Sequence, residues 1–265
     1  MRRRSSLFAA AAALSMAVTA VLAATPAGAA AGGFRYVALG DSYSSGVGNP
    51  PYAEATCKRS TVAYPVLFAA EQRLRLYSSV ACSGATTEAV TGQLARLGRF
   101  TRQVTITVGG NDVGFGTGVA ICLRGTDADC LAAAQASNTA ATEVLPGRLD
   151  ALFAAIRAAA PYADVVVAGY PRFFELTGVC TTAPLNLTKR TVMNAGADTL
   201  NGVIAGRAAT AGFAFADVRP AFDGHGVCGA DPWIHGIVAD GALHPNAAGH
   251  ALGYLPSVRA AFRTA

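Results

Sequence analysis

The sequence predicts an α/β protein built on a mostly parallel sheet. Short runs rich in β-branched residues alternate with longer runs whose apolar residues recur at helical spacing, and connections containing Gly or Pro separate them. This alternation is typical of βα units, whose helices cover a parallel sheet. Residues 30–265 contain no internal repeat and no shift in composition, and they are numerous enough to bury a core. We therefore expect a single domain over residues 30–265.

Each element follows from its local pattern. Strands are expected at residues 36–39, 77–81, 104–108, 165–168 and 214–218, of which 77–81 has the weakest pattern. Helices are expected at residues 63–74, 88–97, 149–160, 192–209 and 247–262. Residues 114–142 fit neither pattern, and we expect an insertion there, held in place by Cys122 and Cys130.

The first 29 residues have the features of a secretory signal peptide. Three arginines at positions 2–4 precede an alanine-rich apolar stretch at 7–24, and residues 27–29 supply the small-x-small pattern that signal peptidase reads. No later run is apolar for long enough to cross a bilayer. We expect cleavage after residue 29, in preference to a retained anchor, and a secreted, extracellular protein.

Much of the positive charge lies in this leader. The whole chain has a formal charge of +5, and residues 1–29 hold three arginines and no acidic residue, which leaves +2 for residues 30–265. No dense Lys/Arg cluster remains, so we expect no nucleic-acid partner.

Six cysteines in an exported chain indicate three disulfides. Although 15 pairings are possible, sequential pairing closes the shortest loops and is favoured. The favoured pairs are Cys57–Cys82, Cys122–Cys130 and Cys180–Cys228. A metal site is not expected, because the chain has no Cys-x-x-Cys pair and its histidines do not fall at zinc-ligand spacing.

Polar residues follow two of the predicted strands. Gly40-Asp41-Ser42 comes after the first strand, and Gly109-Gly110-Asn111-Asp112 comes after 104–108. In an open parallel sheet, ligands bind at these carboxyl ends. Each group also has a purely structural explanation, because Ser42 suits a helix N-cap and Asn111 with Asp112 suits a turn. Asp41 and Asp112 are expected to accept hydrogen bonds within these loops.

A serine nucleophile requires a histidine that takes its proton. Of the four histidines, His244 directly precedes Pro245 and Asn246, which stiffen and cap the start of the last predicted helix. We expect packed or surface roles for the other three, which are His225, His235 and His250.

Acyl transfer also requires donors for the oxyanion of the tetrahedral intermediate. The candidates are the backbone N–H groups of Ser42 and Gly84 and the side-chain amide of Asn111. A disulfide at Cys82 would restrain the loop that carries Gly84.

Together these residues resemble the SGNH hydrolases, also called GDSL-type esterases and lipases. Ser42, Gly84, Asn111 and His244 match the four hallmark positions in order, and the resemblance extends from about residue 36 to residue 251. It is greatest to the secreted actinobacterial esterase, lipase and phospholipase group. The ordinary α/β-hydrolase fold is disfavoured, because Ser44 stands where its Gly-x-Ser-x-Gly elbow requires glycine.

The resemblance implies a flavodoxin-like three-layer α/β/α sandwich with a shallow, open site and no cofactor. It further implies a carboxylic ester hydrolase acting on acylglycerols, simple fatty-acid esters or phospholipids. We expect a monomer that touches a lipid interface only transiently. Apolar residues that would line an acyl site, or else belong to the core, are Phe115, Phe173, Phe174, Trp233 and Ile234.

Two other functions use the same features. A carbohydrate deacetylase or acyltransferase would share the catalytic residues but differ in its acceptor. A non-catalytic, disulfide-braced binding domain would retain only the fold, and the intact serine, amide and histidine argue against it.

The sequence departs from the family at the residue that orients the histidine. The family usually has an aspartate three residues before its histidine, where this chain has Gly241. Asp240 is one residue too early, and Asp231 is more distant. We favour a Ser42–His244 dyad in which a main-chain carbonyl of Gly241 or Ala242 orients the imidazole.

Kinetics of an Asp240→Asn variant test this preference. Turnover should fall only mildly, because a carbonyl would still orient the imidazole of His244. A loss of about 10⁴-fold, as for replacement of a true triad aspartate, would instead identify Asp240 as the orienting group.

Overall fold

The computed structural model describes residues 35–177, 180, 185–237 and 241–265. All of them belong to one compact unit, Gly33–Ala265. The expected signal peptide at residues 1–29 lies outside the described residues.

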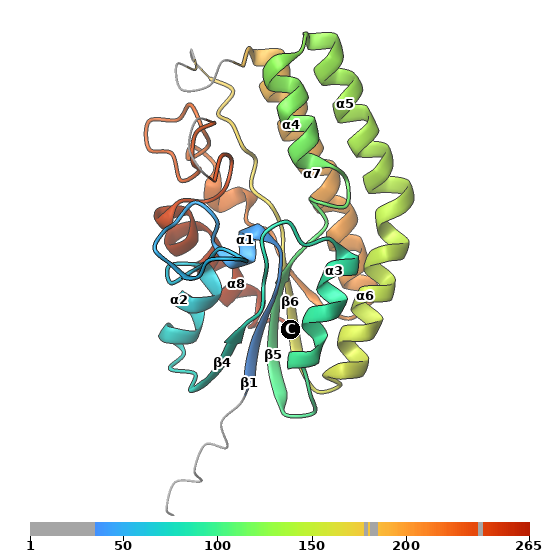
Figure 1. The fold of residues 1–265 in the computed structure, drawn as a ribbon, viewed down its shortest axis with the longest axis vertical. Helices are drawn as coiled ribbons and strands as arrows, with labels where there is room; N and C mark the ends of the chain where they lie inside the picture. Colours follow the sequence, from blue (N-terminus) through green and yellow to red (C-terminus); the bar gives the residue numbers. More distant parts are fainter. Residues whose placement is uncertain (1–34, 178–179, 181–184, 238–240) are drawn as a thin grey trace, which may run out of the picture. The chain divides into compact units, whose positions relative to one another are not determined.

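A five-stranded parallel sheet forms the centre of this unit (Figure 1). Its strands are β1 (Arg35–Gly40), β4 (Leu76–Ser79), β5 (Thr101–Thr107), β6 (Asp164–Ala168) and β7 (Ala214–Ala216). They lie in the order β4-β1-β5-β6-β7, with Val37 aligned to Ser78 on one side and to Val104 on the other. This is the flavodoxin-like strand order, so the predicted fold class is confirmed.

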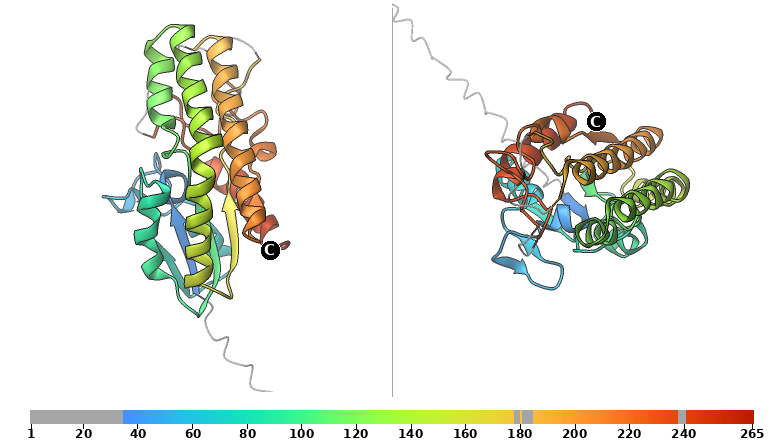
Figure 2. Two further views of the ribbon diagram at one scale, coloured as in Figure 1. Left: turned by 90° about the vertical axis from the view of Figure 1, so that its right-hand side faces the viewer. Right: turned by 90° about the horizontal axis from the view of Figure 1, so that it is seen from above.

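Helices cover both faces of the sheet (Figures 1 and 2). On one face lie α2 (Tyr64–Glu71) and α8 (Leu255–Ala261); on the other lie α3 (Thr87–Thr91), α6 (Leu145–Ala159) and α7 (Leu187–Thr210). Short elements complete the unit: α1 (Ser42–Ser45), the hairpin strands β2 (Tyr52–Glu54) and β3 (Arg59–Ser60), 3₁₀ turns at Gly92–Arg96 and Arg219–Phe222, and π turns at Ala140–Val144 and Gly249–Tyr254.

The segment 114–142, which matched neither pattern, forms two helices. α4 spans Phe115–Arg124 and α5 spans Asp127–Thr139, and α5 continues through a π turn into α6. Few large apolar residues mark a face of α5, and in α4 Gly116 and Gly118 interrupt the apolar residues, so the periodicity was not recognised. The capping box between Thr126 and Asp129 at the start of α5 is a usable signal in the sequence.

Two other predicted elements differ in detail from the structure. The strand expected at 214–218 ends at Ala216, which pairs with Ala168, the last residue of β6. The helix expected at 247–262 is present, but it is wound as a π turn over Gly249–Tyr254 before α8 begins just ahead of Pro256. A proline lacks the N–H that a continuing α-helix would use.

The described residues contain the three disulfides that sequential pairing favoured: Cys57–Cys82, Cys122–Cys130 and Cys180–Cys228. The second joins α4 to α5, and the first joins the β2–β3 hairpin to the loop after β4. Within the described ranges, no helix combines the length and the apolar character needed to span a membrane.

Candidate active site

The polar residues singled out in the sequence meet at the carboxyl ends of β1 and β5. These neighbouring strands lie where the order of connections reverses, which is the usual ligand-binding point of such a sheet. Ser42 begins α1 directly after β1, and Asn111 follows β5. His244, which is 202 residues from Ser42 in the chain, completes the group.

A short helix holds Ser42. Asp41 is the N-cap of α1, and its Oδ1 accepts a hydrogen bond from the Tyr43 N–H at 2.9 Å. The Ser42 side chain reaches His244, whose Nε2 lies 2.7 Å from the serine Oγ. Only 9% of Ser42 is exposed, so the contact is largely shielded from bulk water.

The surroundings of His244 define its tautomer. Its Nδ1 lies 3.0 Å from the carbonyl oxygen of Ala242 and 3.2 Å from that of Gly241. Carbonyl oxygens only accept hydrogen bonds, so we assign the proton to Nδ1, which leaves Nε2 free to accept from the Ser42 hydroxyl. Burial lowers the pKa of His244 below its ordinary value, against the opposing effect of the two carbonyls. The imidazole is therefore neutral at pH 7.

Close packing explains the glycine at position 241. Gly241 has a φ of 93°, in the left-handed region, and a Cβ there would collide with the Cα of Gly48. The position that carries an acid in the family therefore has no room for a side chain here. Asp240 lies outside the described residues, and the carboxylate of Asp231 contacts His225 and Trp233 instead of His244.

The three expected oxyanion donors belong to adjacent loops. Among the described residues, the backbone N–H groups of Ser42 and Gly84 donate to no acceptor. Asn111 Nδ2 donates one hydrogen to the carbonyl of Ala85 at 2.9 Å, and its second amide hydrogen is available to a ligand. The φ of 81° at Gly84 suits glycine and turns its loop at this point.

Asp112 joins the loops that carry Gly84 and Asn111. Its carboxylate accepts hydrogen bonds from the Thr87 N–H at 2.9 Å and the Thr87 hydroxyl at 2.6 Å. Arg148 approaches the same carboxylate at 3.4 Å. Asp112 thus accepts hydrogen bonds in its loop, as Asp41 does.

Tyr170 supports the site in a way that the sequence did not indicate. Its hydroxyl donates to Asp41 Oδ2 at 2.5 Å and accepts from the Gly110 N–H at 3.0 Å. Burial raises the pKa of Asp41 to about 7, although its hydrogen bonds with Tyr170 and Tyr43 act in the opposite direction. Tyr170 follows β6, 129 residues from Asp41, and no local pattern marks it.

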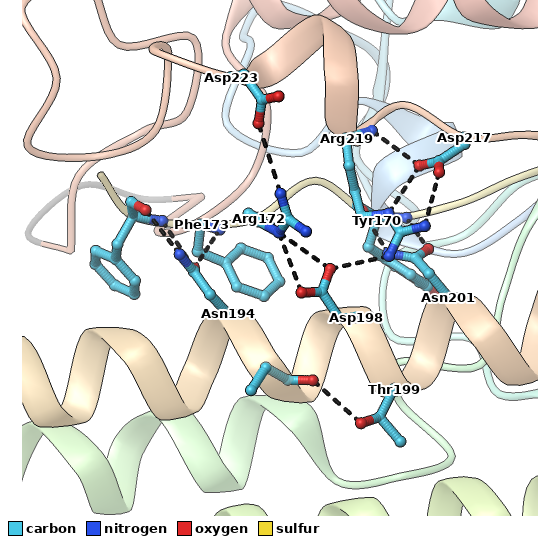
Figure 3. A network of polar contacts seen from close by, with 12 residues as sticks. Tyr170, Arg172, Phe173, Asn194, Asp198, Thr199, Asn201, Asp217, Arg219 and Asp223 are labelled. Atoms are coloured by element: carbon cyan, nitrogen blue, oxygen red, sulfur yellow. Dashed lines mark hydrogen bonds and ion pairs between the residues drawn. The ribbon is translucent and has the colours of Figure 1, made fainter. Parts of the chain in front are cut away.

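Helix α7 fixes the segment that carries Tyr170 (Figure 3). The amide of Asn201 accepts from the Tyr170 N–H at 2.8 Å and donates to its carbonyl at 2.7 Å. Asn194 accepts from the N–H groups of Phe173 and Phe174 further along the segment. The two asparagines therefore satisfy buried backbone groups that lie beyond the end of the strand.

Ion pairs flank these asparagines on the more exposed side (Figure 3). Asp198 of α7 accepts from Arg172 at 3.1 Å and from Arg219 at 2.9 Å, and Arg219 also pairs with Asp217 at 2.7 Å. Exposed ion pairs contribute little stability. The buried amide contacts are therefore the stronger constraint on Tyr170.

Tyr43 is a second supporting residue that sequence reasoning missed. Its hydroxyl donates to the Leu243 carbonyl at 2.6 Å, and its ring centre lies 4.8 Å from that of His244. Leu243 has a φ of 61°, which is unusual for a residue other than glycine. Tyr43 thus anchors a strained turn directly before His244. Its only signal in the sequence is its place beside Ser42.

Two of the five apolar residues suggested for an acyl site line the cavity that opens beside Ser42. They are Phe115 and Phe173, whose ring centres are 4.6 Å apart. Phe174 and Ile234 are buried in the core, and Trp233 stacks on His225 with ring centres 3.6 Å apart.

The remaining histidines lie outside the serine contact. His250 is fully buried, and its Nδ1 accepts from the Tyr64 N–H. His235 pairs its backbone with that of His244. Within the part of the chain that the structure describes, no group of three or more His, Cys, Asp or Glu residues could hold a metal ion.

The fold and site define a carboxylic ester hydrolase of the SGNH type, and comparison with known proteins gives the family. Residues 38–252 match the GDSL-like Lipase/Acylhydrolase family, and the chain belongs to it. Over 264 residues the chain is 45% identical to Lipase 1 of Streptomyces coelicolor, covering 97% of this chain and 96% of that protein.

Two solved structures are similar throughout the described unit. Phospholipase A1 from Streptomyces albidoflavus superposes with a TM-score of 0.84 at 42% identity, covering 86% of this chain and 99% of that one. An extracellular lipase from Streptomyces rimosus gives a TM-score of 0.83 at 44% identity, with the same coverage. These relatives support an esterase or lipase function.

Introducing the missing acid as Gly241→Asp should destabilise the protein instead of improving it. Left-handed strain alone costs about 1–3 kcal/mol, and the collision with Gly48 adds to this cost. Gly212→Asp is the matched control, because Gly212 also has a positive φ, 67°, but has open space around its Cβ. Urea unfolding should give a larger loss of stability at 241 than at 212; equal losses would contradict the close packing described here.

Proposed function

We propose that Ser42 is the nucleophile and His244 the general base in the hydrolysis of fatty-acyl esters. The observation that carries this proposal is the 2.7 Å contact between Ser42 Oγ and His244 Nε2. The neutral imidazole, with its proton on Nδ1, has the correct form to accept the serine proton. The serine also lines the cavity in which an ester could be held.

The reaction proceeds in two halves. His244 Nε2 takes the proton from Ser42 Oγ as this oxygen attacks the ester carbonyl carbon. The resulting imidazolium returns the proton to the leaving alcohol, and an acyl-enzyme remains on Ser42. Water, deprotonated by His244, then attacks this acyl-enzyme; Ser42 leaves with the proton, and the carboxylic acid is released.

The developing oxyanion is held by three donors in this scheme: the backbone N–H groups of Ser42 and Gly84 and the amide of Asn111. Their freedom from other acceptors supports this role for the two backbone groups. Removal of a single such donor typically lowers kcat by about 10²- to 10³-fold.

A main-chain carbonyl orients the histidine in the proposed mechanism. The contacts of His244 Nδ1 with Ala242 and Gly241 support this assignment over a carboxylate. A carbonyl performs two tasks of a triad acid, since it fixes the ring and selects the tautomer. Unlike a triad aspartate, the carbonyl places no negative charge beside the imidazole.

The proposed substrates are acylglycerols, simple fatty-acid esters and phospholipids. The largely apolar cavity beside Ser42 supports an acyl ligand, as do relatives named as lipases and a phospholipase A1. Three disulfides suit an oxidising compartment. We propose that residues 1–29 are removed on export and that residues 30–265 act outside the cell as a monomer, with transient contact at lipid surfaces.

A fluorophosphonate probe tests the nucleophile. Such probes react rapidly with activated serines, so peptide mass spectrometry should find the label on Ser42. Ser42→Ala should abolish labelling and lower kcat on the order of 10⁶-fold, as for loss of a serine nucleophile elsewhere. Ser257→Ala, which removes a distant hydroxyl bonded to Gly253, is the control and should behave as wild type. A label on another serine would refute the assignment.

The pH dependence of kcat/KM tests the base. Protonation removes the base function of His244, and burial lowers its pKa below the ordinary 6.5. As pH falls, kcat/KM should therefore decline with a midpoint below pH 6.5. Asp41, with a pKa of about 7, is the competing group. In the Asp41→Asn variant, kcat/KM should decline at the same pH as in the wild type. If the decline disappears in this variant, the titrating group is Asp41 and not His244.

A further inference from the structure

The cavity beside Ser42 extends well beyond the proposed catalytic residues. It has a volume of about 280 Å³ and is lined by Ser42, Asn111 and His244 together with residues of α4, α5 and α7. These helices lie side by side above the carboxyl end of the sheet (Figures 1 and 2). Along α4, its walls include residues from Phe115 to Cys122, a distance of about 10 Å at 1.5 Å per residue.

We propose that this cavity holds the acyl chain of the ester and that Gly118 and Gly196 determine how long a chain it accepts. The inference rests on the proposed function, because it places the acyl carbonyl at Ser42. The two glycines therefore act as specificity-determining residues.

The walls favour a chain of methylene groups over an acetyl group. Phe115, Val119 and Cys122 of α4 face Met193 and Leu200 of α7 across the cavity. Each methylene that leaves water for such a wall adds to binding. An acetyl group would leave most of this surface uncovered, so the cavity argues against a deacetylase. The Cys122–Cys130 disulfide fixes the α4–α5 pair that forms one side.

The two glycines leave space in the wall that other residues would fill. A methyl group on Gly118 would lie 3.6 Å from Ser137 Oγ, and one on Gly196 would lie 3.8 Å from Asn138 Oδ1. Both distances are ordinary van der Waals contacts, and neither glycine has a left-handed φ. A Cβ at 118 or 196 therefore fits without a clash, and a larger side chain there would take up space at a position that lines the cavity.

Glycine is otherwise unfavourable at these positions. Each glycine inside a helix costs about 0.5–1 kcal/mol of stability relative to alanine. We infer that the space left by each glycine in the cavity wall compensates for this cost. The polar groups of Ser137 and Asn138 lie opposite and bear no side-chain hydrogen bond within the described ranges. An acyl chain that extended past the glycines would cover these polar groups and remove their hydration. This desolvation would be unfavourable and would oppose further extension of the chain.

Chain-length profiles of Gly118→Leu and Gly196→Leu test the inference. We would measure kcat/KM on p-nitrophenyl acetate, butyrate, octanoate and palmitate. Relative to wild type, octanoate and palmitate should lose about 10-fold or more, since a methylene in a pocket discriminates by about 10- to 200-fold. Acetate and butyrate should change by less than about 2-fold. Gly196→Ala, with a smaller side chain, should give an intermediate profile.

Gly206→Leu is the matched control. Gly206 lies on the same helix, is exposed, has open space around its Cβ and lies outside the cavity. It should keep the wild-type profile. Thermal unfolding of every variant shows whether it is folded, and Gly118→Ala and Gly196→Ala replace any leucine variant that is not.

The outcomes separate the two proposals. An unchanged profile in the folded variants, or an equal loss on all four esters, would overturn the role of the glycines, provided that turnover still depends on Ser42. Turnover that survives Ser42→Ala would instead overturn the proposed function itself.

Discussion

One buried hydroxyl ties together the carboxyl ends of three strands. The Tyr170 O–H, beyond β6, donates to Asp41 at the end of β1 and accepts from the Gly110 N–H beyond β5. A carboxyl group as buried as Asp41 is costly unless its oxygens are satisfied. Because Asp41 caps the helix that begins with Ser42, the position of the serine depends on this contact. Asn201 of α7 in turn holds Tyr170 by both of its backbone polar groups, so a covering helix contributes to the geometry of the site.

The site was predictable where its signals are local. Ser42 and Asn111 each follow a strand directly, and His244 precedes a proline, so short stretches of sequence indicated that they meet at one edge of the sheet. Tyr170 and Tyr43 carried no such signal, because each acts through a hydroxyl on a partner more than 100 residues away. The role of glycine at 241 was equally hidden, since it depends on how closely a distant loop passes.

The fold was predictable for a similar reason. Buried parallel strands are short apolar runs, and four of the five main strands were evident from composition alone. The helices α4 and α5 were missed because they cover a cavity as well as a core. Glycines interrupt the apolar residues of α4, and alanine makes up much of α5. Such residues weaken the apolar periodicity by which helices are recognised. The feature that obscured these helices in the sequence is the same one that leaves the cavity open.

The distance along the chain between Ser42 and His244 has a consequence for the stage of folding at which the two residues meet. Contacts 202 residues apart form only after a large part of the chain has been ordered, because loop closure is costly until the sheet assembles. An unfolded chain therefore carries its serine and histidine without bringing them together, and the proposed nucleophile has no base until the sheet has assembled.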